Sequence, residues 1–171
     1  VRFLNSLRLR KKLKKYGIEL VHGTPVYPQG FEYTKNSATL SYEKLYSCIT
    51  FAGHTHKPAA YLYTKQKRDI TASVFIPTDP FDNRLMMIER ETMVRMEEFD
   101  IEPNPDQRYY VNPGSVGQPR DGVPKASYMI YDTVLKKIFL KRSEYNTEAV
   151  KAKILKVKLP TDLANRVVKG N

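Results

Sequence analysis

The chain contains three histidines, each of which follows a short apolar run, and two of them, His22 and His54, stand next to a glycine. His22 follows residues 18–21, and His54 and His56 follow residues 48–52. Imidazole nitrogen is the commonest protein ligand for zinc, iron, manganese and related divalent ions. Short apolar runs bounded by glycine are typical of buried strands, and ligands collect at the carboxyl ends of strands in α/β sheets. The three histidines are therefore the candidate metal ligands.

The three positions do not carry equal weight. Taken alone, His22 is best explained as a hydrogen-bonded loop residue. His54 and His56 favour a ligand role, because they stand in Gly-His-Thr-His between a buried strand and a proline, where a turn would let them converge or hold two adjacent ions. Nucleophilic catalysis fits less well, since there is no G-x-S-x-G motif. Cys48 lies in an apolar run and is expected to be a packing residue.

The chain is strongly basic, with 29 Lys and Arg against 18 Asp and Glu, and a formal net charge of +11. Much of this surplus lies in residues 8–15, RLRKKLKK. Apolar residues at helical spacing predict a helix over residues 3–16 that ends at Gly17. The basic block is then either a solvated helix face, which we favour, or an anion-binding surface. In either case it would attract a phosphorylated substrate.

The other elements are mostly strands, so the fold class is α/β (or α+β) in a single domain over residues 1–171. Beyond the runs at 18–21 and 48–52, and a short helix at 37–46, we expect strands at 61–63, 73–76, 85–88, 93–99 and 106–111. A hairpin is expected at 127–131 and 137–141, and terminal helices at 147–155 and 161–168. No apolar run is long enough to cross a membrane, and one cysteine suits a reducing, cytoplasmic location.

Three segments carry a resemblance to a known family: residues 21–25 (VHGTP), 51–58 (FAGHTHKP) and 111–121 (VNPGSVGQPRD). They resemble the calcineurin-like metallophosphoesterases, and most of all the small prokaryotic branch described as phosphodiesterase or diadenosine-tetraphosphatase-like. The closing residues 159–164 (LPTDLA) look like the tail of that branch. The resemblance covers nearly all of the chain from Ile18 onward.

The resemblance implies part of a four-layer α/β/β/α sandwich with a β-meander, short C-terminal helices and a two-metal site. His22 and His54 would share one ion and His56 would hold its neighbour. The metals would be two divalent ions, such as Mn, Fe, Zn, Ni or Mg. The resemblance also implies a second group of site residues, which lie behind the metal site or contact the substrate. A turn without any function would equally explain the Asn-Pro-Gly sequence. That group comprises Asn112, Ser115 and Arg120.

The family's D-x-H, G-D-x-x-D and G-N-H motifs do not occur in the chain. We therefore expect it to be the C-terminal portion of a metallophosphoesterase domain, with the bridging aspartate and the general-acid histidine upstream of Val1. Two ions held close together repel each other, and three neutral imidazoles bring no negative charge to offset this. We expect the complete protein to hydrolyse a phosphate ester with a two-metal-activated hydroxide. We expect this segment alone to be inactive and to bind metal weakly.

Two other functions stay open. The chain would be a non-catalytic remnant of the fold that acts as a binding or scaffold module, or a basic nucleic-acid-binding, nuclease-like domain. The expected partner is a phosphorylated small molecule or a nucleotide, with nucleic acid as a further possibility and no membrane. Since a missing third would uncover part of a sheet, we also expect self-association through that apolar face.

Overall fold

In this computed structural model the chain is described over residues 2–25, 44–65, 70–77, 85–89, 92–96, 98–102 and 104–171. The larger sheet has the strand order β1-β2-β3-β9-β4-β5-β6-β7, and the smaller has the order β10-β11-β8. The strands are β1 (Arg10–Leu13), β2 (Ile18–Val21), β3 (Ile49–Ala52), β4 (Pro58–Lys65), β5 (Ile70–Pro77), β6 (Leu85–Glu89), β7 (Thr92–Met96), β8 (Glu98–Asp100), β9 (Gln107–Pro113), β10 (Ala126–Asp132) and β11 (Lys137–Ser143). The helices are α1 (Arg2–Ser6), a 3-10 turn at Lys14–Tyr16, α2 (Thr147–Lys156) and α3 (Thr161–Lys169).

The centre of the larger sheet is parallel and its flanks are antiparallel. Strands β2, β3 and β9 run in the same direction, whereas β1 and β4 run against their neighbours. The segments that follow β2, β3 and β9 therefore leave the sheet at one edge. This edge is where the chain carries His22, the Gly-His-Thr-His segment and the Asn-Pro-Gly segment.

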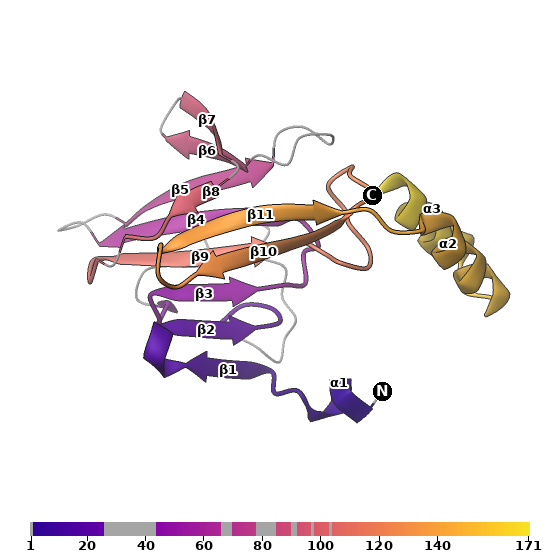
Figure 1. Cartoon of the computed structure of the whole chain (residues 1–171), viewed down its shortest axis with the longest axis horizontal. Helices are drawn as coiled ribbons and strands as arrows, with labels where there is room; N and C mark the ends of the chain where they lie inside the picture. Colours follow the sequence, from indigo (N-terminus) through magenta and orange to yellow (C-terminus); the bar gives the residue numbers. More distant parts are fainter. Residues whose placement is uncertain are drawn as a thin grey trace.

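The two sheets pack face to face, with β10 and β11 lying over β9 and β4 (Figure 1). Successive side chains of a strand alternate between its faces, so Ile49 and Val111 enter the core between the sheets, while Thr50 and Tyr110 face the other side. The buried residues of this core are Ile18, Ile49, Ala60, Phe99, Ile101, Tyr109, Val111, Ile138 and Leu140.

Most of the expected elements are confirmed, including the mixed α/β class, the two sheets and the two C-terminal helices. The apolar run at 93–99 is an exception, because it divides into β7 of the larger sheet and β8 of the smaller one. The helix expected at 37–46 lies almost wholly outside the described residues.

The helix expected over residues 3–16 is wrong. Only α1 is α-helical, and the basic block forms the edge strand β1 and a 3-10 turn that ends at Gly17, whose φ is +65°. The antiparallel register sets Lys12 opposite Glu19, a carboxylate that is fully buried and pairs with Arg10. Pairing with β2 and neutralisation of Glu19 override the helical spacing of the leucines.

The C-terminal helices form a hairpin beyond the end of the sheets (Figure 1). The hairpin is fixed at Gly170, whose carbonyl accepts a hydrogen bond of 2.7 Å from the Gly122 amide. Gly170 has a φ of +71°, and a Cβ there would lie 2.6 Å from the backbone carbon of Val123, so only glycine fits. In the described part of the chain, no helix is long and apolar enough to cross a membrane.

An apolar hollow of about 530 Å³ opens between the two sheets near their β1 side. Its wall includes Leu13, Leu20 and Phe51 from the larger sheet, and Met129 and Tyr131 from the smaller one. Leu20 is 37% exposed, although it lies inside a strand. Self-association through this face stays a prediction.

Cys48 immediately precedes β3 and packs against the core between the sheets. Burial raises the pKa of its thiol, and the positive charges of Arg108 and Lys136 offset this only in part. The environment is that of a packing residue rather than a nucleophile.

Removal of the Arg10 side chain should destabilise the fold, because it leaves the Glu19 carboxylate buried with only Lys12 at 4.0 Å. We expect Arg10→Ala to lower the free energy of unfolding by about 2 kcal/mol, since Arg10 itself is partly exposed. Lys11→Ala, on the same strand but exposed, should change it by less than about 0.5 kcal/mol. Urea unfolding followed by circular dichroism measures both, and equal effects would contradict the role of the ion pair.

The raised pKa of the Cys48 thiol predicts slow alkylation. A raised pKa moves deprotonation to higher pH, so less thiolate is present at about pH 8 than in a free cysteine. Iodoacetamide should therefore modify the folded chain about tenfold more slowly than the urea-unfolded chain under the same conditions, as followed by mass spectrometry. Equal rates would show that Cys48 is not protected.

Candidate metal centre

The parallel register of β2 and β3 brings His22 and His54 together. Val21 pairs with Ala52, and the amide of the next residue, Gly53, donates a 3.0 Å hydrogen bond to the carbonyl of His22. The His22 and His54 rings then meet edge to face, with centroids 5.2 Å apart and an interplanar angle of 69°. His22 is exposed and His54 is half-buried, so this ring pair lies at the surface of the sheet edge.

The Gly-His-Thr-His segment is a strained turn. His54 and His56 both have positive φ angles, of 71° and 61°, in the left-handed region. The Thr55 amide donates a 2.9 Å hydrogen bond to the carbonyl of Gly53, which closes a three-residue turn around His54. Such backbone costs about 1–3 kcal/mol per residue and persists only where the surrounding structure enforces it. The expected turn is thus present at His54 and His56.

The side chain of Asn112 holds this turn from behind. Asn112 lies near the end of β9, is only 2% exposed, and donates through Nδ2 to the Gly53 carbonyl and to Thr55 Oγ1, each at 2.8 Å. Its Oδ1 accepts the Gly114 amide at 2.9 Å. Asn112 therefore ties the β9 turn to the histidine turn, as a positioning residue.

His56 is oriented by the loop that follows β9. Its Nδ1 lies 2.7 Å from the carbonyl oxygen of Gln118. A carbonyl only accepts, so Nδ1 is the donor in this contact, and the neutral ring in this tautomer has its lone pair on Nε2. Metal-binding histidines are commonly held in this way by a carbonyl on the opposite ring nitrogen. The Arg120 amide also donates to the His56 carbonyl, at 3.2 Å.

Gln118 was not among the residues expected from the sequence. Its contribution is a backbone carbonyl, which every residue type has, so the sequence carries no signal for it. Ser115 and Arg120 were expected, and both support this loop: Ser115 Oγ accepts the Gln118 amide at 3.0 Å, and Arg120 Nη2 donates to Gln118 Oε1 at 2.8 Å. A contact of Arg120 with substrate stays a prediction.

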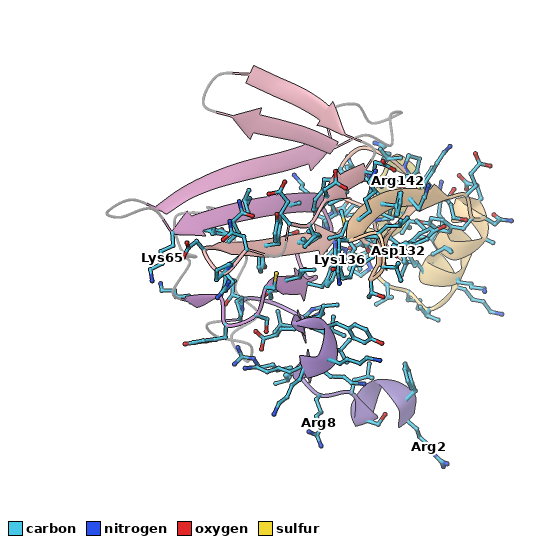
Figure 2. The ribbon with its side chains drawn as sticks, turned by 60° about the vertical axis from the view of Figure 1, so that its left-hand side comes forward. Arg2, Arg8, Lys65, Asp132, Lys136 and Arg142 are labelled. Atoms are coloured by element: carbon cyan, nitrogen blue, oxygen red, sulfur yellow. The ribbon has the colours of Figure 1, made fainter. Side chains whose placement is uncertain are left out.

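A buried ion pair anchors the same loop to the smaller sheet. Asp121 pairs with Arg142 of β11, and their side chains are 8% and 1% exposed. Figure 2 shows Arg142 lying where β11 leaves the sheets toward the C-terminal helices. The loop that orients His56 is therefore held at two places: by its hydrogen bonds to His56, next to the larger sheet, and by the Asp121–Arg142 pair at the smaller sheet.

The donor chemistry at this edge suits a divalent ion, because imidazole binds zinc, nickel, manganese and iron. The structure brings His22 and His54 into contact and fixes the ring of His56. Among the described residues, however, no three His, Cys, Asp or Glu side chains form a group that could hold an ion. His22, His54 and His56 are all described, and they do not form such a group.

The fold is similar to those of two solved structures. The structure is similar to a metallophosphoesterase from Sphaerobacter thermophilus, with a TM-score of 0.72, 29% identity and 99% of the chain covered. The hypothetical protein PH1004 from Pyrococcus horikoshii OT3 shares the fold, with a TM-score of 0.58 and 18% identity. In sequence, the chain is 31% identical over 172 residues to the uncharacterized protein MJ0912 of Methanocaldococcus jannaschii. No protein-family model matches the chain.

These relatives are longer than the chain. It spans 59% of the Methanocaldococcus protein, 60% of the Sphaerobacter metallophosphoesterase and 54% of the Pyrococcus protein. The mixed α/β fold with two sheets and two short C-terminal helices is thus similar to the metallophosphoesterase fold over the part that the chain covers.

Loss of the Asn112 side chain should loosen the histidine turn. Asn112→Ala leaves the Gly53 carbonyl and Thr55 Oγ1 without this donor, and we expect it to lower the free energy of unfolding by about 1–3 kcal/mol. Asn165→Ala, on the exposed face of α3, is the matched control and should change it by less than about 0.5 kcal/mol.

The effect should be local as well as global. The imidazole signals of His54 and His56 in a ¹H–¹³C NMR spectrum should shift in Asn112→Ala and stay in place in the control. Unchanged stability together with unchanged histidine signals would contradict the positioning role of Asn112.

Proposed function

We propose that the complete protein is a metal-dependent phosphoesterase and that this chain supplies its histidine ligands. The observation that carries the proposal is the strained Gly-His-Thr-His turn at a sheet edge, with His22 against His54 and the ring of His56 oriented by a carbonyl. Strained backbone at a ligand-type residue is typical of functional sites. The likeness to the Sphaerobacter metallophosphoesterase supports the same assignment.

His22 and His54 would hold one divalent ion, and Nε2 of His56 would face its neighbour. A divalent ion bound there would supply Lewis acidity for attack on a phosphate ester. The chain's own residues orient these ligands: Asn112 fixes the turn, and the Gln118 carbonyl fixes the tautomer of His56. The net charge of +11 favours an anionic substrate.

The rest of the protein would complete the site. Two adjacent cations need an anionic ligand between them, and about two-fifths of the relatives' length lies outside the region that the chain covers. We assign the bridging aspartate and the general acid to that region. The substrate would be a phosphomonoester or phosphodiester in the cytoplasm, as in the small prokaryotic branch that the motifs resemble.

The non-catalytic scaffold is the competing function. A scaffold has no use for two histidines held at positive φ. In a metal site, the same backbone conformation would direct the two imidazoles toward the ions. Binding of a metal ion that depends on His54 separates the two functions before any activity is measured.

Metal content and turnover test the proposal. The complete protein, loaded with Mn²⁺, should hydrolyse p-nitrophenyl phosphate or bis-p-nitrophenyl phosphate. His54→Ala should lower turnover and bound metal by about 100-fold, and Asn165→Ala should leave both unchanged. Residues 1–171 alone should bind metal weakly in isothermal titration calorimetry and show no turnover.

Several outcomes would contradict the proposal. A complete protein that takes up no metal, or one whose metal content is unchanged in His54→Ala, would rule out the histidine site. Turnover by residues 1–171 that is lost in His54→Ala would instead overturn the assignment of essential groups to the rest of the protein.

A further inference from the structure

A cavity of about 820 Å³ joins His22 to the basic block of the chain. It is lined by residues 6–12 and 20–22, so His22 and the start of the edge strand β1 line the same cavity. A space of this size holds a ligand as large as a nucleotide. The basic residues between Arg8 and Lys12 thus line the same cavity as His22 of the candidate metal centre.

The β1–β2 hairpin produces this arrangement. Arg10 pairs with Val21 in antiparallel register, so the residues just before Arg10 pass beside the residue just after Val21, which is His22. A helix over residues 3–16 would not have this register. The juxtaposition of Arg8 and His22 is therefore a product of the hairpin and not of the sequence spacing.

The cations of the cavity fall into two groups. Arg10 pairs with Glu19, Lys12 lies 4.0 Å from the same carboxylate, and both lie over the ring of Tyr46, at 5.7 and 5.6 Å from its centroid. Arg8 and Lys11 are exposed and, within the described residues, form no ion pair. Figure 2 shows the Arg8 side chain extending away from the ribbon.

We propose that Arg8 and Lys11 form a second anion site, which binds a further phosphate of a substrate whose scissile phosphate lies at the histidines. The proposal rests on the phosphoesterase function and narrows its substrate to a compound with two or more phosphates in a chain. A guanidinium forms paired hydrogen bonds with phosphate oxygens, and an ammonium adds a point charge. The uncommitted charges of Arg8 and Lys11 are available for this contact without breaking the pair that neutralises Glu19.

Protection of the sheet edge is the other explanation of these charges. Edge strands often carry Lys or Arg, because charge prevents pairing with another chain. Edge protection needs only a charge somewhere along β1, and it does not need any affinity for phosphate. It therefore predicts that a phosphate chain binds no better at Arg8 and Lys11 than at any other pair of surface lysines.

The test is direct binding of inorganic tripolyphosphate to residues 1–171 without metal, in the presence of EDTA, by isothermal titration calorimetry. Arg8→Gln/Lys11→Gln should weaken binding by about tenfold and reduce its dependence on salt concentration. Lys153→Gln/Lys156→Gln removes the same charge from exposed positions of α2 and should weaken binding by less than about twofold. Both variants alter exposed side chains, and equal urea midpoints confirm that they are folded.

Equal loss in the two double variants, or no measurable binding of tripolyphosphate by the unaltered chain, would overturn the second anion site. Because the titration contains EDTA, it does not depend on metal at the histidines, so failure of the metal centre and failure of this site are separate results. A short oligothymidylate, titrated in parallel, distinguishes the source of the phosphates. Preference for it over tripolyphosphate assigns the site to a nucleic-acid backbone, and the reverse assigns it to a compact polyphosphate.

Discussion

The buried side chain of Asn112 is the constraint on which the candidate site depends. Two backbone positions in the histidine turn are held at positive φ, and such strain relaxes unless other contacts oppose it. Asn112 supplies two donors to the turn and one acceptor to its own loop, in a place with little access to water. Its hydrogen bonds join the ends of β3 and β9, so the geometry of the histidines follows from the packing of the sheet.

Positive charge dominates the region around the candidate histidines. The sheet edge presents imidazoles, the neighbouring cavity presents cations, and the buried Glu19 is already committed to Arg10. A surface of this kind attracts phosphate. In the part of the chain that the structure describes, however, no three His, Cys, Asp or Glu side chains form a group that could hold an ion. The longer relatives show that chains of this fold extend well beyond the region covered here. The proposed division of the site, with nitrogen ligands in this region and oxygen ligands elsewhere, fits both observations.

Local residue patterns predict most elements of this chain but fail at its N-terminal end. The runs at 18–21 and 48–52 are strands, because apolar residues flanked by glycine have few other stable arrangements. The leucines of the first sixteen residues satisfy a helical period equally well, but the neighbouring β2 requires a partner strand and a cation for Glu19. Helix propensity differs by only about 0.5 kcal/mol per residue between ordinary residue types. Pairing with a neighbouring strand and neutralisation of a buried carboxylate therefore outweigh the helical spacing of the leucines. The register of β1, and with it the place of Arg8, was not readable from the period.

The sequence by itself determined the mixed α/β class, most strands, the C-terminal helices and the three candidate histidines with the turn that carries two of them. Residue types and glycine spacing suffice for these, since they are local properties. Tertiary structure alone decided that His22 meets His54, that a carbonyl of Gln118 orients His56, and that the basic block borders the same edge. Each of these depends on strand register, and register is set by contacts between segments far apart in the chain.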